Sequence, residues 1–217
     1  MNYYLRAFML FGCTFITGAA IHYFTHDALG DPYTSMLMWV FLSGTFLLYI
    51  RLFGKSRWAL FTKPGKLHGT AWLLCLGILM LFFINNYFLA IYSSLNMPGD
   101  QVRQPLAWVL LSFAISSTGE EIVYRGFLQT YINQNVGSGE WKLSRGNIFA
   151  TVLMTVAHFG FFTAMDVLFA VTGILLVCLF SLVAGYLRDR TGGLVVPILF
   201  HITVNYLHTL VQLAFGE

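Results

Sequence analysis

Residues 167–187 read VLFAVTGILLVCLFSLVAGYL, a run without a single charged side chain. A helix of about 20 mostly apolar residues spans the hydrocarbon core of a bilayer, so this run is typical of a transmembrane helix. The whole chain of 217 residues has the same character, with 58% hydrophobic and only 10% charged residues. Soluble globular domains carry roughly a quarter of their residues as charged side chains. The composition therefore predicts a polytopic membrane protein.

Six further runs have the length and composition of a membrane span. Backbone polar groups must be satisfied internally within a bilayer, and these runs are long enough to do so as helices. The seven predicted spans are residues 7–24, 33–52, 70–92, 104–131, 146–162, 166–187 and 193–215. The linkers between them are too short for a soluble domain. We predict an all-α bundle of about seven transmembrane helices that forms a single domain over residues 1–217.

Basic residues gather in alternate linkers, as expected for cytoplasmic loops. On one side lie Arg6, Arg51, Lys55, Arg57, Lys63, Lys66, Lys142, Arg145, Arg188 and Arg190; on the other lie Asp27, Asp31, Asp100, Asp166 and the single Arg103. This distribution predicts a cytoplasmic N-terminus and an external C-terminus, and a bacterial inner membrane is the expected location. The net charge of +3 thus reflects topology. Membrane lipids, and not nucleic acid, are the expected partners.

The remaining basic residue, Arg125, lies inside the fourth span in the stretch SSTGEEIVYRGF at residues 116–127. Charged groups at this depth cost at least a few kcal/mol and usually mark a function or a structural pair. Glu121 and Arg125 are four residues apart with the acid first, which favours an ion pair. Glu120 points about 100° away from Glu121 and has no obvious partner on its own helix. It is a candidate general base, although a polar clamp that only sets helix register would explain the same charges.

Two other spans carry polar side chains at comparable depth. His158 lies in the fifth span, whereas His201 and Asn205 project from one face of the seventh. At about 1.5 Å per residue, Glu120, His158 and His201 lie roughly 12–20 Å from the cytoplasmic ends of their helices. We therefore expect one shared cavity. Asn85 and Asn86 are interpreted as hydrogen-bonding groups between helices, and His208 as an interfacial residue.

These residue types leave two hydrolytic mechanisms open. Peptide hydrolysis needs a base that activates water and donors that stabilise the developing negative charge. Glu120 can be the base, with His158, His201 and Asn205 as donors. Alternatively, His158 and His201, with or without a carboxylate, could bind a divalent metal such as zinc, whose bound water is the nucleophile. An H-E-x-x-H helix is absent from the sequence.

The order of these motifs resembles that of the CAAX prenyl endopeptidases and bacteriocin-processing enzymes, also called Abi or CPBP intramembrane proteases. The resemblance covers residues 116–205, with a family-like catalytic core expected over about 104–215. Its three motifs are Glu120-Glu121-x-x-x-Arg125 followed by Gly126, then His158, then His201-x-x-x-Asn205. The chain has Met154 four residues before the histidine of the second motif, where the family usually has Phe. Both side chains are large and apolar, so we expect the packing to be kept.

The resemblance implies a role for each matching residue. Glu120 corresponds to the water-activating glutamate, and Glu121 with Arg125 to the structural pair beside it. His158, His201 and Asn205 correspond to the catalytic residues of the second and third motifs. The implied activity is that of an intramembrane endopeptidase, with or without a metal, acting on a peptide or lipid-modified peptide.

Two other classes of function fit the same polar cluster. Buried Glu and His chains also form the proton relays of proton-coupled transporters, although the sequence lacks the inverted repeats typical of many such proteins. Some members of the resembled family are immunity or scaffold proteins, in which the cluster would only stabilise the bundle.

Overall fold

The computed structural model describes residues 2–30, 33–53, 60–62, 65–92, 105–139 and 143–215. Within these ranges the chain is helical and contains no strand. Seven helical segments are long and apolar enough to cross a membrane, which confirms the predicted fold class. The helices are α1 (Tyr3–Leu29), α2 (Tyr33–Phe53), α3 (Gly69–Tyr92), α5 (Leu106–Glu121), α6 (Thr130–Val136), α7 (Arg145–Ala157), α8 (Phe161–Ala164), α9 (Val167–Thr191) and α10 (Val195–Phe215).

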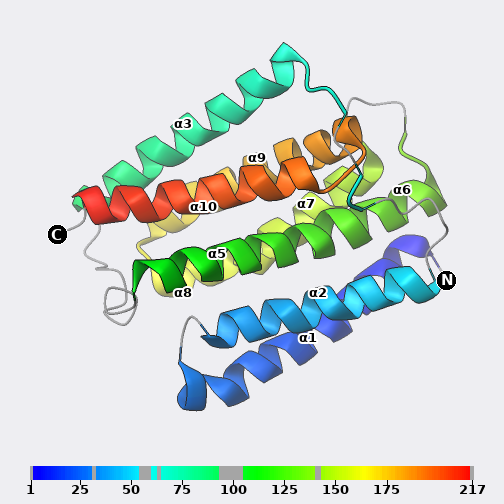
Figure 1. Ribbon diagram of the computed structural model, residues 1–217, viewed down its shortest axis with the longest axis horizontal. Coiled ribbons are helices and arrows are strands. Elements are labelled where there is room, and N and C mark those ends of the chain that lie inside the picture. Colours follow the sequence, from blue (N-terminus) through cyan, green and yellow to red (C-terminus); the bar gives the residue numbers. More distant parts are fainter. Residues whose placement is uncertain are drawn as a thin grey trace.

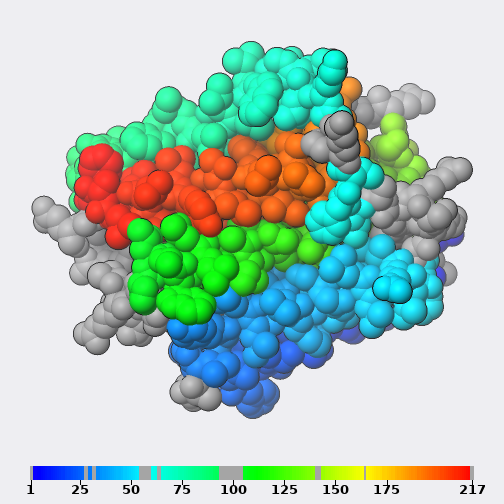
Figure 2. Space-filling view, viewed as in Figure 1, coloured from blue at the N-terminus to red at the C-terminus, as the bar shows by residue number. Residues whose placement is uncertain are grey.

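The fourth span lies at the centre of the bundle. α5 packs between α2 and α10; α1 packs on the outer side of α2, and α3 on the outer side of α10 (Figure 1). α3, α10, α5 and α2 follow one another as bands across the face seen in Figure 2. α7 and α9 pack against each other, and α9 also contacts α3 and α10. The span that carries Glu120, Glu121 and Arg125 is thus surrounded by other helices, as expected for charges at bilayer depth.

The helix ends that carry basic residues gather at one end of the bundle. They are the start of α1, the end of α2, the start of α7 and the end of α9 (Figure 1). The start of α9, next to Asp166, lies at the opposite end. Helix ends with basic residues thus lie at one end of the bundle, as the predicted orientation requires. Which end is cytoplasmic stays a prediction. Lys55, Arg57, Lys63, Arg103, Lys142, Asp31 and Asp100 lie outside the described residues.

Two predicted spans are less regular than the sequence indicates. The fourth changes from α-helix to π-helix over Ile122–Gln129 (η1), where the Thr130 hydroxyl donates to the Arg125 carbonyl at 2.9 Å. The fifth is broken after α7 by a 3₁₀ turn over His158–Gly160. His158 has φ −91° and ψ 4°, in the sparsely populated bridge region. Both irregularities lie within or beside a predicted site motif, where such features are common.

Gly185 allows α9 to lie close to α7. The Asn147 side chain of α7 donates to the Leu182 carbonyl at 3.0 Å, and a Cβ on Gly185 would overlap its carboxamide. Gly185→Ala is therefore expected to lower the free energy of unfolding by about 1–3 kcal/mol, because the bond of the buried Asn147 is lost. Thermal unfolding in detergent measures this change. Gly77→Ala on α3 is the control, since a Cβ there meets no atom within 4 Å; equal stability of the two variants would contradict the packing argument.

Candidate active site

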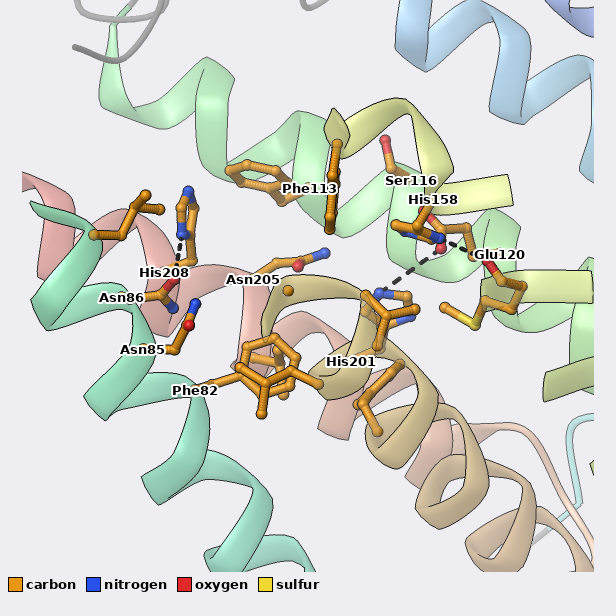
Figure 3. A pocket seen from close by; sticks show the side chains of 18 of the residues that line it. Phe82, Asn85, Asn86, Phe113, Ser116, Glu120, His158, His201, Asn205 and His208 are labelled. Atoms are coloured by element: carbon orange, nitrogen blue, oxygen red, sulfur yellow. Dashed lines mark hydrogen bonds and ion pairs between the residues drawn. The ribbon is translucent and has the colours of Figure 1, made fainter. Parts of the chain in front are cut away.

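The structure brings four predicted site residues to one cavity of about 430 Å³. Glu120 comes from the last turn of α5, His158 from the break between α7 and α8, and His201 and Asn205 from α10 (Figure 3). The same cavity is lined by side chains from α2, α3 and α9. Residues that are far apart in the sequence thus lie around a single space, and their roles stay predictions.

Glu120 is the acidic residue that faces this cavity. Its side chain is buried, and its Oε2 atom has no hydrogen-bond partner among the described residues. His201 Nε2 lies 4.0 Å from that oxygen, and a dashed line marks the pair in Figure 3. A buried carboxylate oxygen without a partner is unusual and costly, so it is expected to bind a group that is not part of the fold, such as water or substrate.

His201 is held by Glu121, the second of the adjacent glutamates. Its Nδ1 atom donates to Glu121 Oε1 at 2.9 Å, and Nε2 is turned toward Glu120; in the neutral ring this Nε2 atom is an acceptor. A carboxylate on one ring nitrogen fixes the tautomer and the orientation of an imidazole. The sequence predicted a partner for Glu121 only on its own helix, and no local signal pointed to a histidine 80 residues away.

Arg125 forms the predicted ion pair and connects it to two further helices. Its Nε atom lies 3.5 Å from Glu121 Oε2, and both side chains are fully buried. Its Nη2 atom donates to Ser181 Oγ of α9 at 2.6 Å, and the Ser181 hydroxyl donates to Thr151 of α7 at 3.0 Å. Glu121 and Arg125 thus act as a clamp between helices, while Glu120 lies on the cavity side.

His158 is oriented by the turn that precedes it. Its Nδ1 atom donates to the Met154 carbonyl at 2.8 Å, so Nε2 is the acceptor of the neutral ring here as well. Met154 is fully buried, as expected for a residue that replaces a packed phenylalanine. Its sulfur also accepts from Arg125 Nη2 at 3.6 Å, a contact that phenylalanine cannot make. The second motif is therefore packed directly against the clamp.

Asn205 is positioned from α5. Its Nδ2 atom donates to the buried Ser117 hydroxyl at 2.9 Å. An amide nitrogen carries two hydrogens, so a second one remains for a ligand in the cavity. The sequence motif predicts no role for Ser117, because serine is common in helices and carries no specific signal.

The two histidines of the cavity are potential metal ligands. The Nε2 atom of a neutral histidine, as in His158 or His201, is of the kind that binds zinc. In the described part of the chain, however, no group of three or more His, Cys, Asp or Glu side chains lies close enough together to hold a metal ion. The described residues therefore do not fit a zinc site with three protein ligands.

Residues 102–207 match the family model of the type II CAAX prenyl endopeptidase Rce1-like proteins. The matched segment contains all six predicted site residues, from Glu120 to Asn205. Neither a curated protein nor a solved structure matches the chain. The match confirms the resemblance inferred from the motifs. Residues 102–207 therefore form a domain of the Rce1-like type II CAAX prenyl endopeptidase family, and with its seven apolar helices the chain is an integral membrane protein.

Proposed function

We propose that the protein hydrolyses a peptide bond of a membrane-associated or prenylated peptide, with Glu120 as the base that activates water. One observation carries the proposal: the Glu120 Oε2 atom, which has no hydrogen-bond partner among the described residues, faces His201 Nε2 across 4.0 Å at the wall of a cavity. The family match supports an intramembrane protease activity in general. The location in a bacterial inner membrane and the opening of the cavity to the cytoplasm stay predictions.

The gap between Glu120 and His201 suits one water molecule. Two hydrogen bonds of about 2.8 Å that meet near the tetrahedral angle bridge atoms roughly 4–5 Å apart. The water would donate one hydrogen to Glu120 Oε2 and the other to His201 Nε2, since Nδ1 of that ring already donates to Glu121. Glu120 would take the first proton as the water oxygen bonds to the peptide carbonyl carbon.

The remaining steps need a donor for the oxyanion and a proton for the leaving amine. The second N–H of Asn205 is the neutral donor at this wall, because both imidazoles present lone pairs to the cavity. His158 can pass the proton from Glu120 to the amide nitrogen as the C–N bond breaks. The products are a carboxylic acid and an amine, which become a carboxylate and an ammonium once the acid gives up its proton, and Glu120 returns to its ionised form.

The walls of the cavity support an apolar substrate. Five phenylalanines line it: Phe82, Phe113, Phe161, Phe169 and Phe180. Among the described lining residues, Glu120 is the only carboxylate, and none is Lys or Arg. A prenyl chain or apolar peptide side chains would be buried favourably here, at about 25 cal/mol for each Å² removed from water.

A cleavage assay in lipid nanodiscs tests the proposed function. The substrate is an internally quenched farnesylated peptide, with the unmodified peptide for comparison, and mass spectrometry identifies the products. The metal content is measured on the same sample. We expect cleavage at one bond by a sample without stoichiometric metal. The proposal is wrong if neither peptide is cleaved while a pH gradient drives uptake of a solute into proteoliposomes, as a transporter would do.

Asn205→Ala is expected to lower kcat about 10²–10³-fold with little change in KM, because its N–H stabilises charge that develops only in the transition state. Steady-state kinetics with the farnesylated peptide measure this effect. Ser117→Ala is the matched control: it removes the positioning bond but keeps the amide, so a loss of about tenfold or less is expected. Equal losses in the two variants would show that Asn205 acts only in packing.

A further inference from the structure

A second polar cluster lies in the same cavity, away from Glu120. Asn85 and Asn86 of α3 and His208 of α10 line this part of the cavity, beyond Asn205 in Figure 3. His208 Nδ1 donates to Asn86 Oδ1 at 3.0 Å. The bond connects α3 to α10, as expected for a polar pair between helices. His208, however, faces the cavity and does not have the interfacial role suggested by the sequence.

The cluster has hydrogen-bonding capacity that the fold does not use. Asn86 is 4% exposed, and its Nδ2 atom has no hydrogen-bond partner among the described residues. His208 donates through Nδ1, so Nε2 of this ring is an acceptor. A buried donor without a partner is destabilising, particularly where water is scarce. One donor and one acceptor at the same wall complement a peptide group, which offers a carbonyl oxygen and an N–H.

The charges of the cavity favour this uncharged ligand over an anion. No Lys or Arg is found among the described lining residues. A carboxylate or phosphate would lose its hydration without gaining a cation, which is strongly unfavourable in a buried site. An amide needs only the two hydrogen bonds that Asn86 and His208 can make.

We propose that Asn86 and His208 form a subsite that binds a peptide group of the substrate, roughly 10 Å from the scissile bond. The distance follows because His208 is seven positions after His201 on α10, at a rise of about 1.5 Å per residue. An extended peptide advances about 3.3–3.6 Å per residue, so the bound amide lies about three residues from the cleaved bond. The inference rests on the proposed function and assigns the substrate an extended conformation in the cavity.

Kinetics of Asn86→Leu in nanodiscs, with the farnesylated peptide, test the subsite. We expect KM to rise about tenfold and kcat to change less than about twofold, as for the loss of a hydrogen bond made equally in the ground and transition states. Gln212→Leu is the matched control. Gln212 donates to the Asn86 backbone carbonyl at 3.3 Å and thus also connects α3 to α10, but it is not among the cavity-lining residues. Its KM is expected to stay within about twofold of the wild type.

A substrate series locates the bound group without relying on any variant. Each amide within four residues of the scissile bond is replaced in turn by an ester, which removes the N–H and weakens the carbonyl as an acceptor. For the wild type, one ester about three residues from the bond is expected to raise KM about tenfold. With that ester, Asn86→Leu should add little, because the two changes remove the same interaction.

The outcomes separate the subsite from the proposed function. The proposed hydrolase stands if the wild type cleaves the peptide and Glu120→Gln does not. The subsite is then wrong if the ester series leaves KM unchanged, or if Gln212→Leu has the same KM as Asn86→Leu. The choice of an uncharged ligand is also wrong if the wild-type KM depends on a free C-terminal carboxylate of the peptide and this dependence is lost in Asn86→Leu. Failure of the wild type to cleave any peptide overturns both.

Discussion

Glu120→Gln is expected to lower kcat for cleavage of a prenylated peptide by about 10³-fold, because a carboxamide has the shape of the carboxylate but cannot accept a proton from water. The fold should be retained. Glu120 Oε2 has no hydrogen-bond partner among the described residues, and its nearest basic group is His201 Nε2 at 4.0 Å. Steady-state cleavage assays in nanodiscs give the rate, and thermal unfolding of the same samples shows whether the variant is folded.

Ser116→Ala is the control for this substitution. Ser116 lines the same cavity and lies one helical turn before Glu120, yet it has no assigned chemical role. Its kcat is expected within about threefold of the wild type, since exposed or partly buried polar groups without a special role usually matter little. A folded Glu120→Gln protein with the full biological activity of the wild type would instead favour the immunity or scaffold class, in which the cluster only stabilises the bundle.

Arg125→Met is expected to reduce the free energy of unfolding by about 3–5 kcal/mol, because it leaves the fully buried Glu121 carboxylate without its cation. Ser181 and Met154 also lose the guanidinium that connects η1 to α9 and α7. Thermal unfolding in detergent, or loss of folded protein during purification, measures the effect. An Arg125→Met protein as stable as the wild type would show that the clamp does not hold these helices together.

The double variant Glu121→Gln/Arg125→Met separates the clamp from catalysis. With both charges removed, most of the lost stability should return, since replacing a whole buried ion pair costs less than removing one partner. Activity should stay well below that of the wild type, because His201 Nδ1 no longer donates to a carboxylate. If the double variant is as unstable as the sum of the two single variants, the two residues do not interact as an ion pair.

The seven spans and the shared cavity could be predicted because both depend on local regularities. The apolar length of each run sets a membrane crossing, and the constant rise of a helix sets the depth of each polar side chain. Glu120, His158 and His201 were placed at comparable depth on these grounds alone. The structure brings all three to one cavity wall.

The contacts that orient the site could not be predicted, because they are made across the bundle. The bonds of Glu121 to His201 and of Ser117 to Asn205 join residues 80 and 88 positions apart, and helical spacing carries no information on such pairs. The same holds for His208, whose polar partner on α3 lies 122 residues away. The π-helical segment and the turn at His158 were missed because hydrophobic periodicity does not distinguish small changes in helical winding.

Hydrolysis of the farnesylated peptide in H₂¹⁸O, followed by mass spectrometry of both products, tests the central claim most directly. If Glu120 activates water, the wild type should release two fragments with one ¹⁸O atom in the new carboxylate. In the same interval, Glu120→Gln should release almost none. Intact peptide after incubation with folded wild-type protein, or labelled fragments formed by Glu120→Gln at the wild-type rate, would contradict the assignment.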